Sequence, residues 1–310
     1  MKGYVELFLE NTPTKKRMHR RVVLTRWCAT PGQVIYRYRG DVGRDPGTMD
    51  RNRMLTSSDF GSAMGVGRFK NRNQIFKDKF IACCEKIGIR PETLKPDPPK
   101  KYDLKNDCLE HGLQTEEYAL EILSTILRVP VEKATTTYEI YTDGEHNFKL
   151  GSTPDGYVTV DGERSVVEVK CPYISESLLK KGLNEMDPDH WCQVQGQMAV
   201  TGLNSCYYAV YMSKGNQYSV KYVTKDQDFI QVMLYELFKL AMHIDQAVEC
   251  VAKTGNMDEV LRDFKLITSK PVKTELLNYI AQRQKDHVRS LYHTDEDSVI
   301  TVEAPGEPRS

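Results

Sequence analysis

The hydrophobic pattern changes at Pro130, and this change restricts the fold more than any other feature of the sequence. Before it, apolar residues recur at roughly helical spacing over residues 109–127, which predicts a long helix. After it, short β-rich segments are separated by Gly or Asp-Gly turns, which predicts strands. These segments lie at about 131–141, 147–150, 155–160 and 165–170. The chain is therefore predicted to have an α/β core.

Further helices and strands are predicted on both sides of this region. The helices are expected at about 56–63, 71–87, 174–183, 188–202, 226–252 and 272–292, and the strands at 205–212 and 217–223. Residues 1–50 look irregular, and the polar tail from about Asp295 is expected to be loose. We therefore predict a basic N-terminal extension over 1–50, a core over 51–225 and a helical C-terminal region over 226–310 that packs on the core.

The net charge of zero hides a strong asymmetry along the chain. Residues 1–100 carry 21 Lys and Arg against 10 Asp and Glu, whereas the remaining 210 residues carry 22 against 33. A basic first third and an acidic remainder suit a protein that binds a polyanion and also needs a cluster of carboxylates. The alternative is that these charges are solvated surface residues distributed by chance.

The sequence predicts an intracellular protein that is neither secreted nor bound to a membrane. No apolar run approaches the roughly 18 residues that a membrane span needs. The N-terminus has no apolar stretch ahead of a small-residue cleavage site, so the 8 cysteines are expected to be reduced thiols. A basic cluster within residues 15–21 suits a nuclear import signal, a phosphate-binding arm or a solvated loop, so the expected location is the cytoplasm or a host nucleus.

Two carboxylates and a lysine in the centre of the chain predict a magnesium site. Asp155 lies in a Pro-Asp-Gly turn that enters a strand, and Glu168 and Lys170 share one face of the next strand because they are two residues apart. If the strands are antiparallel neighbours, Asp155, Glu168 and the backbone carbonyl of Val169 can bind one Mg²⁺. Lys170 would then orient or deprotonate a metal-bound water, or offset charge on a phosphate. The alternative is a surface strand with a salt bridge.

Two helices carry side chains that could complete this site. Gln193 and Gln197 are four residues apart and so share a helix face, from which an amide can contact a phosphate or the attacking water. Glu116 or Glu117 could add a further carboxylate. The alternative for each pair is an ordinary polar helix face, and Gln197 in particular fits that description.

These blocks, in this order, resemble the lambda-type exonucleases, also called the YqaJ-like viral recombinase family, within the PD-(D/E)xK nuclease superfamily. The matching segments are LTSSDF (55–60), HGLQTEEYA (111–119), STPDG (152–156), VEVKCP (167–172), WCQVQ (191–195) and MAVT (198–201). The resemblance implies a restriction-endonuclease-like α/β core, with a mixed central sheet flanked by helices. It also implies a Mg²⁺-dependent 5′→3′ exonuclease that degrades linear double-stranded DNA for viral or phage-type recombination or genome processing, with Mn²⁺ as a substitute ion.

The resemblance also assigns roles to residues. Asp155 and Glu168 match the metal ligands, Lys170 the catalytic lysine, Glu116 the helix carboxylate near the metal and Gln193 the active-site glutamine. Arg51, Ser58 and Thr153 match the pocket for the 5′ phosphate, with Arg53 close enough to replace Arg51. The implied partners are DNA ends, a single-strand annealing protein and further copies of the chain in a homo-oligomer.

Basic residues on or beside the helix at 71–87 could follow the duplex backbone without reading its sequence. They are Lys70, Arg72, Lys77 and Lys79. The alternative is a solvated helix face.

Three other functions are alternatives to this interpretation. An iron–sulfur nuclease is rejected because the cysteines do not have cluster spacing. An endonuclease on DNA or RNA of the viral alkaline nuclease type stays open. The intact set of Asp155, Glu168, Lys170 and Gln193 argues against a catalytically inactive DNA-binding or packaging module.

Overall fold

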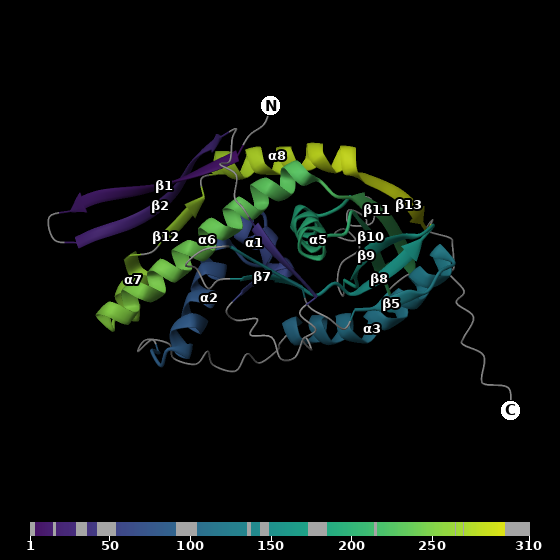
Figure 1. Ribbon diagram of the computed structural model, residues 1–310, viewed down its shortest axis with the longest axis horizontal. Coiled ribbons are helices and arrows are strands. Elements are labelled where there is room, and N and C mark those ends of the chain that lie inside the picture. The colour runs from purple at the N-terminus through teal and green to yellow at the C-terminus, as the bar shows by residue number, and fades with distance from the viewer. Residues whose placement is uncertain are drawn as a thin grey trace.

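A mixed six-stranded sheet forms the core of the computed structural model, which describes residues 4–14, 17–28, 36–41, 54–90, 104–134, 138–142, 149–172, 185–213, 216–263, 265–268 and 270–294 (Figure 1). The strand order is β13-β11-β10-β9-β8-β5, and only the β9–β10 pair is parallel within this described sheet. The strands are β5 (Val131–Lys133), β8 (Gly156–Val160), β9 (Glu163–Lys170), β10 (Ser205–Met212), β11 (Gln217–Thr224) and β13 (Val288–His293).

Helices cover both faces of this sheet, as the α/β prediction requires. Helix α3 (Leu104–Leu127) packs Ala119 and Leu123 against Val167 and Val169 of β9. Helix α5 (Pro188–Thr201) packs on the opposite face, against the side to which Val166 points. The alternation of side chains along β9 therefore sends its valines to two separate hydrophobic clusters and directs Glu168 and Lys170 toward α5.

A second sheet lies beside this core. Its strand order is β3-β6-β7-β4, formed by β3 (Tyr36–Asp41), β6 (Tyr138–Thr142), β7 (Lys149–Ser152) and β4 (Met54–Thr56). Strands β4 and β7 are parallel, with Thr56 opposite Gly151. Helices α1 (Ser57–Met64) and α2 (Arg72–Lys86) follow β4, close to the boundaries predicted from the sequence.

The prediction that residues 1–50 are irregular is wrong for residues 4–14, 17–28 and 36–41, which form strands. Strands β1 (Tyr4–Thr14) and β2 (Arg17–Cys28) form a long antiparallel pair, and β12 (Lys265–Thr268) adds to β2 in parallel. The basic cluster contributed to the error, although Val22, Val23 and Trp27 are good strand formers. Arg17, Arg20 and Arg21 lie on β2, whereas Lys15 and Lys16 lie outside the described residues.

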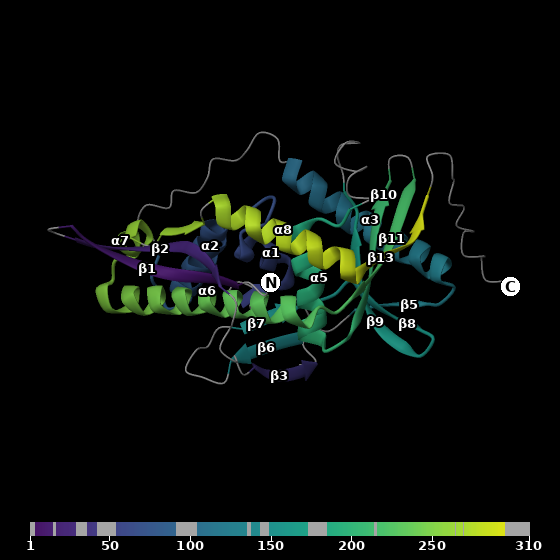
Figure 2. The same ribbon diagram turned by 90° about the horizontal axis from the view of Figure 1, so that it is seen from above.

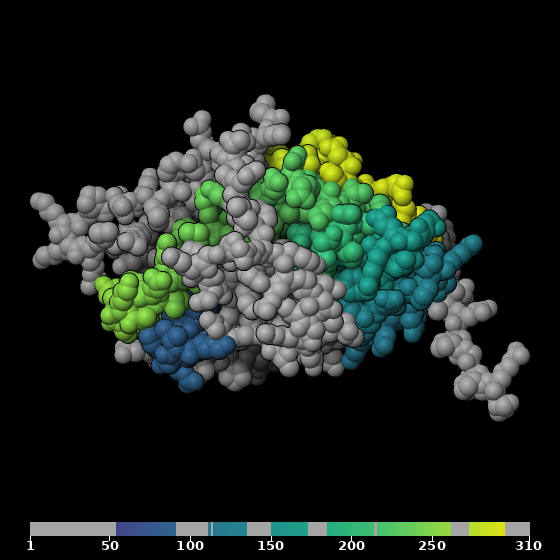
Figure 3. All heavy atoms as spheres, in the orientation of Figure 1, coloured from purple at the N-terminus to yellow at the C-terminus, as the bar shows by residue number. Residues whose placement is uncertain are grey.

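Three helices follow the last strand of the predicted core: α6 (Gln227–Thr254), α7 (Met257–Asp263) and α8 (Lys270–His287). Helix α6 packs on α1, α2 and α5 (Figure 2). Figure 3 shows the atoms of α2, in blue, beside the light-green atoms of α7 and of the adjoining end of α6. The predicted helix over 272–292 is too long, because residues after His287 pair with the edge of the sheet as β13. The predicted helix at 174–183 and the tail from Asp295 lie outside the described residues.

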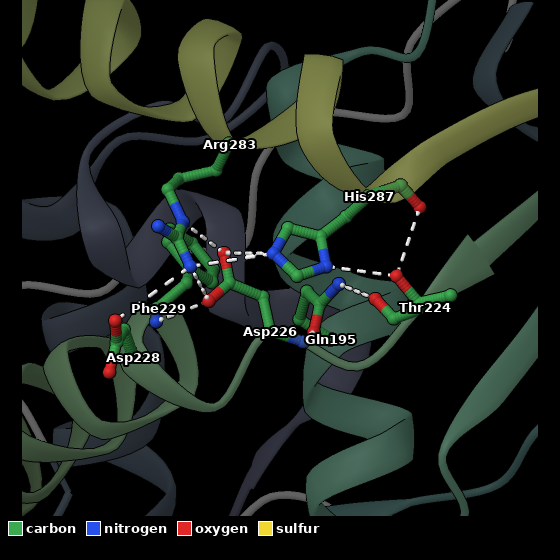
Figure 4. A network of polar contacts seen from close by, with 7 residues as sticks. All are labelled: Gln195, Thr224, Asp226, Asp228, Phe229, Arg283 and His287. Atoms are coloured by element: carbon green, nitrogen blue, oxygen red, sulfur yellow. Dashed lines mark hydrogen bonds and ion pairs between the residues drawn. The ribbon is translucent and has the colours of Figure 1, made fainter.

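A buried polar network holds α8 against the core (Figure 4). Asp226, which caps α6, is fully buried and accepts hydrogen bonds of 2.5 Å from two Arg283 nitrogens. Thr224 Oγ1 lies 2.9 Å from His287 Nδ1, and Gln195 of α5 donates to the Thr224 carbonyl. This network fixes the end of α8 and thereby the start of β13.

Among the described helices, none has the length and apolar character needed to cross a membrane.

Candidate active site

The hairpin formed by β8 and β9 fixes the position of Asp155. Asp155 directly precedes β8, and its N–H donates to the Val167 carbonyl at 3.2 Å. Its carboxylate Oδ2 accepts a hydrogen bond of 2.7 Å from the Val169 N–H. A Cβ at Gly156 would lie 2.8 Å from the Glu132 carbonyl oxygen, so only glycine fits there without a shift of the backbone. The predicted antiparallel neighbours are therefore present, and they turn Asp155 toward β9.

Glu168 and Lys170 lie on the same face of β9, as the alternation predicts. Glu168 is buried, with 1% of its surface exposed, and Lys170 Nζ forms an ion pair with its Oε1. Burial lowers the pKa of Lys170, but the charges of Glu168 and Asp155 outweigh it, so the pKa is raised above its ordinary value. The lysine is therefore held as a cation inside a carboxylate cluster.

Two glutamines of helix α5 donate hydrogen bonds to the Glu168 carboxylate. Gln193 Nε2 donates to Glu168 Oε1, and Gln197 Nε2 donates to Glu168 Oε2. Gln197 is fully buried, so it is part of the site and not a solvated helix face. The spacing of the two glutamines was visible in the sequence, but their shared target depends on how α5 packs against β9.

Local features fix where α5 begins and how closely it approaches α1. Asp187 caps the helix by accepting from the Asp189 N–H, and Pro188 occupies its first turn. A Cβ at Gly196 would lie 2.3 Å from the Phe60 ring, so this glycine permits the contact between the two helices.

Glu116 of α3 joins the electrostatic cluster from the other side of the sheet. It is half-buried, whereas Glu117 is exposed. Burial and the charge of Glu168 raise the pKa of Glu116, and Lys133 and Lys170 oppose this shift. Burial, together with Glu168, also raises the pKa of Asp155 well above its ordinary value. Three carboxylates therefore interact around one ammonium group.

These carboxylate oxygens fit a hard divalent cation whose coordination is completed by other ligands. No group of three or more His, Cys, Asp or Glu side chains in the part of the chain that the structure describes is arranged as a metal cage. Mg²⁺ is commonly bound by one or two carboxylates together with waters and substrate phosphates, so Asp155 and Glu168 suffice. Glu168 Oε1 already accepts two hydrogen bonds and Oε2 accepts one, which leaves a lone pair on Oε2.

Two of the three residues matched to the phosphate pocket lie on adjacent segments. Because β4 and β7 are parallel neighbours, the residues that follow them lie side by side, and Ser57 Oγ is 3.0 Å from Ser152 Oγ. Ser58 is exposed, with its hydroxyl 3.0 Å from Thr56 Oγ1, and Thr153 is half-buried two residues before Asp155. Arg51 and Arg53 lie outside the described residues.

The cations predicted to follow DNA have different environments. Lys77 is exposed, and Lys70 is an exposed partner of Asp78 at 2.7 Å. Lys79 is mostly covered and pairs with Asp59 at 2.9 Å. Arg72 is only 3% exposed and pairs with Glu236 at 3.2 Å, so it cannot reach a DNA backbone from this position.

The sequence did not indicate two residues that are neighbours of the site. They are Asp189 and His190, at the start of α5. The charge of Asp189 contributes to the raised pKa of Lys170. His190 Nδ1 lies 2.7 Å from the hydroxyl of Tyr208, and Tyr208 lies opposite Glu168 in the β9–β10 pair. The cap at Asp187 could have located this helix terminus, but only the packing of α5 places it beside Lys170.

Comparisons with known proteins agree with this architecture. The family described as YqaJ-like viral recombinase domain matches residues 48–204. No curated protein matches the chain.

Solved structures of two exonucleases, one from Laribacter hongkongensis and one from Haemophilus somnus 129PT, are similar to this chain. The alkaline exonuclease LHK-Exo of Laribacter hongkongensis is 18% identical, covers 66% of this chain and 94% of its own, and has a TM-score of 0.50. Its complex with dAMP gives the same identity and coverage, with a TM-score of 0.51. A phage related exonuclease from Haemophilus somnus 129PT is 12% identical over 64% of this chain and 96% of its own, with a TM-score of 0.42. The likeness to LHK-Exo confirms the predicted fold class.

Proposed function

The chain belongs to the YqaJ-like viral recombinase domain family, and from this premise we propose that it is a divalent-metal-dependent nuclease that degrades linear double-stranded DNA in the 5′→3′ direction. The observation that carries the proposal is the set of contacts on one buried carboxylate. Glu168 accepts from Lys170, Gln193 and Gln197, and the Asp155 carboxylate is fixed on the adjacent strand end.

Phosphodiester hydrolysis needs an activated water, stabilisation of charge on the phosphoryl oxygens and help for the leaving 3′ oxygen. A Mg²⁺ or Mn²⁺ ion bound by Asp155, Glu168 and the Val169 carbonyl, with Glu116 beside it, would act as Lewis acid and lower the pKa of a bound water.

The protein's own residues position the reacting groups. Lys170 Nζ, held by Glu168, can orient the attacking water, move a proton at that water, or offset charge on the phosphate. Gln193 uses its amide nitrogen on Glu168, and its carbonyl oxygen can accept a hydrogen bond from the water.

The direction of digestion follows from the proposed phosphate pocket. Arg51, Ser58 and Thr153 would bind a terminal 5′ phosphate and set a bond near that end over the carboxylate cluster. Charge-assisted contacts to a phosphate are strong, and an arginine can make two of them at once. Lys70 and Lys77 would contact the phosphate backbone of the duplex.

The test of this function is a time course on linear duplex labelled at either the 5′ or the 3′ end. We expect release of the 5′ label first, and faster digestion of 5′-phosphorylated than of 5′-hydroxyl duplex. Arg51→Ala should reduce that preference by roughly 10- to 100-fold, which corresponds to the loss of a charged hydrogen bond. Covalently closed circles should resist. Rapid cutting of circles, or equal rates on both kinds of end, would instead favour an endonuclease.

Gln197 gives a separate test of the metal site. Gln197→Met keeps the length of the side chain but removes the hydrogen bond to Glu168 Oε2, the oxygen with a spare lone pair. Residues that orient a metal ligand typically contribute about 10- to 100-fold to metal affinity, so we expect Mn²⁺ to bind weaker by that factor.

Mn²⁺ binding can be measured by electron paramagnetic resonance without DNA. The matched control is Gln231→Met, an exposed glutamine on α6, which should leave the affinity unchanged. Equal affinity of the Gln197→Met and wild-type proteins for Mn²⁺ would contradict a role for Glu168 Oε2 in binding the ion.

A further inference from the structure

Phe69, between α1 and α2, is the most exposed large hydrophobic residue in the part of the chain that the structure describes. It is 89% exposed, whereas the next most exposed, Ile87, is at 51%. An aromatic ring of this kind loses the favourable free energy of burial, about 25 cal/mol for each Å² left in water. When the surrounding segment is held in a fixed conformation, a binding role can explain the exposure of such a side chain.

The backbone on both sides of Phe69 is tightly hydrogen-bonded. Gly65 adopts a left-handed conformation, and the N–H groups of Val66 and Gly67 both donate to the Gly61 carbonyl, at 2.9 and 3.0 Å. After Phe69, Asn71 and Gln74 form a reciprocal capping box at the start of α2. The segment therefore presents Phe69 to solvent from two anchored ends.

Arg68 places this segment beside the candidate active site. Its guanidinium lies 3.2 Å from the Asp187 carboxylate, and its N–H donates to Asp189 at 3.4 Å. Both aspartates belong to the beginning of α5, the helix that supplies Gln193 and Gln197. Asp189 is also close enough to Lys170 for its charge to raise the pKa of that lysine.

The charges around the ring favour a polyanionic partner. Arg68 and Lys70 flank Phe69 in sequence, and their ion pairs with Asp187 and Asp78 are partly exposed, with cation exposures of 37% and 44%. Ion pairs at the surface contribute little, so a phosphate can compete for either cation.

We propose that Phe69 stacks on a base at the end of the DNA, while Arg68 and Lys70 contact the flanking phosphates. Stacking on an aromatic side chain needs an uncovered base face, and a duplex offers one only at its terminus or where a base is unpaired. The inference rests on the proposed function and adds to it a residue that distinguishes an end from the interior of a duplex.

The test is the binding of short blunt duplexes by fluorescence anisotropy in EDTA, where cleavage plays no part. Base–aromatic stacking contributes enough that Phe69→Ala should weaken binding by about 5- to 100-fold. Phe69→Tyr should bind like the wild type, and Phe69→Leu, apolar but without a flat face, should resemble Phe69→Ala. Ile87→Ala, which removes another exposed hydrophobic side chain at the end of α2, should have no effect.

A direct readout comes from 2-aminopurine placed at the terminal or at a central position of the duplex. We expect the terminal probe alone to change fluorescence with the wild-type and Phe69→Tyr proteins, and not with Phe69→Ala. Unchanged binding by Phe69→Ala, wild-type affinity of Phe69→Leu, or a shift in sedimentation coefficient caused by Phe69→Ala would each overturn the stacking role. Failure of the wild-type protein to bind any duplex would instead count against the proposed function.

Discussion

Asp155→Asn and Glu168→Gln are each expected to reduce DNA cleavage below about a tenth of the wild-type rate while DNA binding stays at or above the wild-type level. Each carboxylate is proposed to hold the catalytic ion, and losing that ion removes both the activated water and the Lewis acid. Binding should survive because affinity for DNA comes mainly from phosphate contacts elsewhere. Removing a negative charge from the cluster would even favour a polyanion.

Asp155→Asn is the cleaner of the two changes. An asparagine oxygen can still accept the hydrogen bond from the Val169 N–H, so the hairpin should keep its geometry. Glu168→Gln is more disruptive, because Glu168 accepts from three donors and a glutamine carries only one oxygen. Thermal unfolding should therefore accompany the activity measurement for Glu168→Gln.

Two matched controls lie in the same hairpin. Asp161→Asn changes an exposed turn residue with a φ of 51°, a conformation that asparagine tolerates, and Glu163→Gln changes an exposed residue at the start of β9. Both should cleave DNA like the wild type. Cleavage above about a tenth of the wild-type rate by Asp155→Asn or Glu168→Gln would contradict the assignment of that carboxylate as a metal ligand.

The strands around the candidate site could be predicted because their signals are local. The Pro-Asp-Gly turn and the alternation on β9 were enough to bring Asp155 near Glu168, and the structure pairs Gly156 with Val167 in that hairpin. The role of Gln197 was not accessible in the same way. Its spacing from Gln193 gives a shared helix face, but its burial against Glu168 depends on the docking of α5.

Some features could not be predicted because they depend on strand-pairing or ion-pair partners far away along the chain. The end of the last predicted helix becomes β13 because β11 offers an edge, and β12 similarly adds to β2. Arg72 looked like a surface cation in a helix of mixed charge, yet it is buried against Glu236, 164 residues later. A local pattern contains no information on such pairings, and tertiary packing overrides propensity at these places.

Lys170→Ala is expected to lower the single-turnover cleavage rate by at least about 100-fold, because positioned acid–base groups typically contribute 10²- to 10⁴-fold. Mn²⁺ should still bind, since Asp155 and Glu168 are intact and Glu168 Oε1 loses one hydrogen-bond donor. Metal affinity and rate should therefore separate in this variant. Lys133→Ala is the matched control, because Lys133 is exposed on β5 and acts on Glu116 only through its charge. A similar loss in Lys133→Ala would mean that any nearby positive charge supports the reaction.

Lys170→Arg decides which role the lysine has. The ammonium is a compact group, only 26% exposed, and it lies against Glu168 beside the Asp155 carboxylate. A guanidinium carries the same charge but is wide and planar and does not give up a proton, so it cannot take the same place or move a proton at the water. We therefore expect Lys170→Arg to recover little of the rate lost in Lys170→Ala. If it keeps most of the wild-type rate, the charge of Lys170 is what matters, and its role is to stabilise the phosphate and not to position the attacking water.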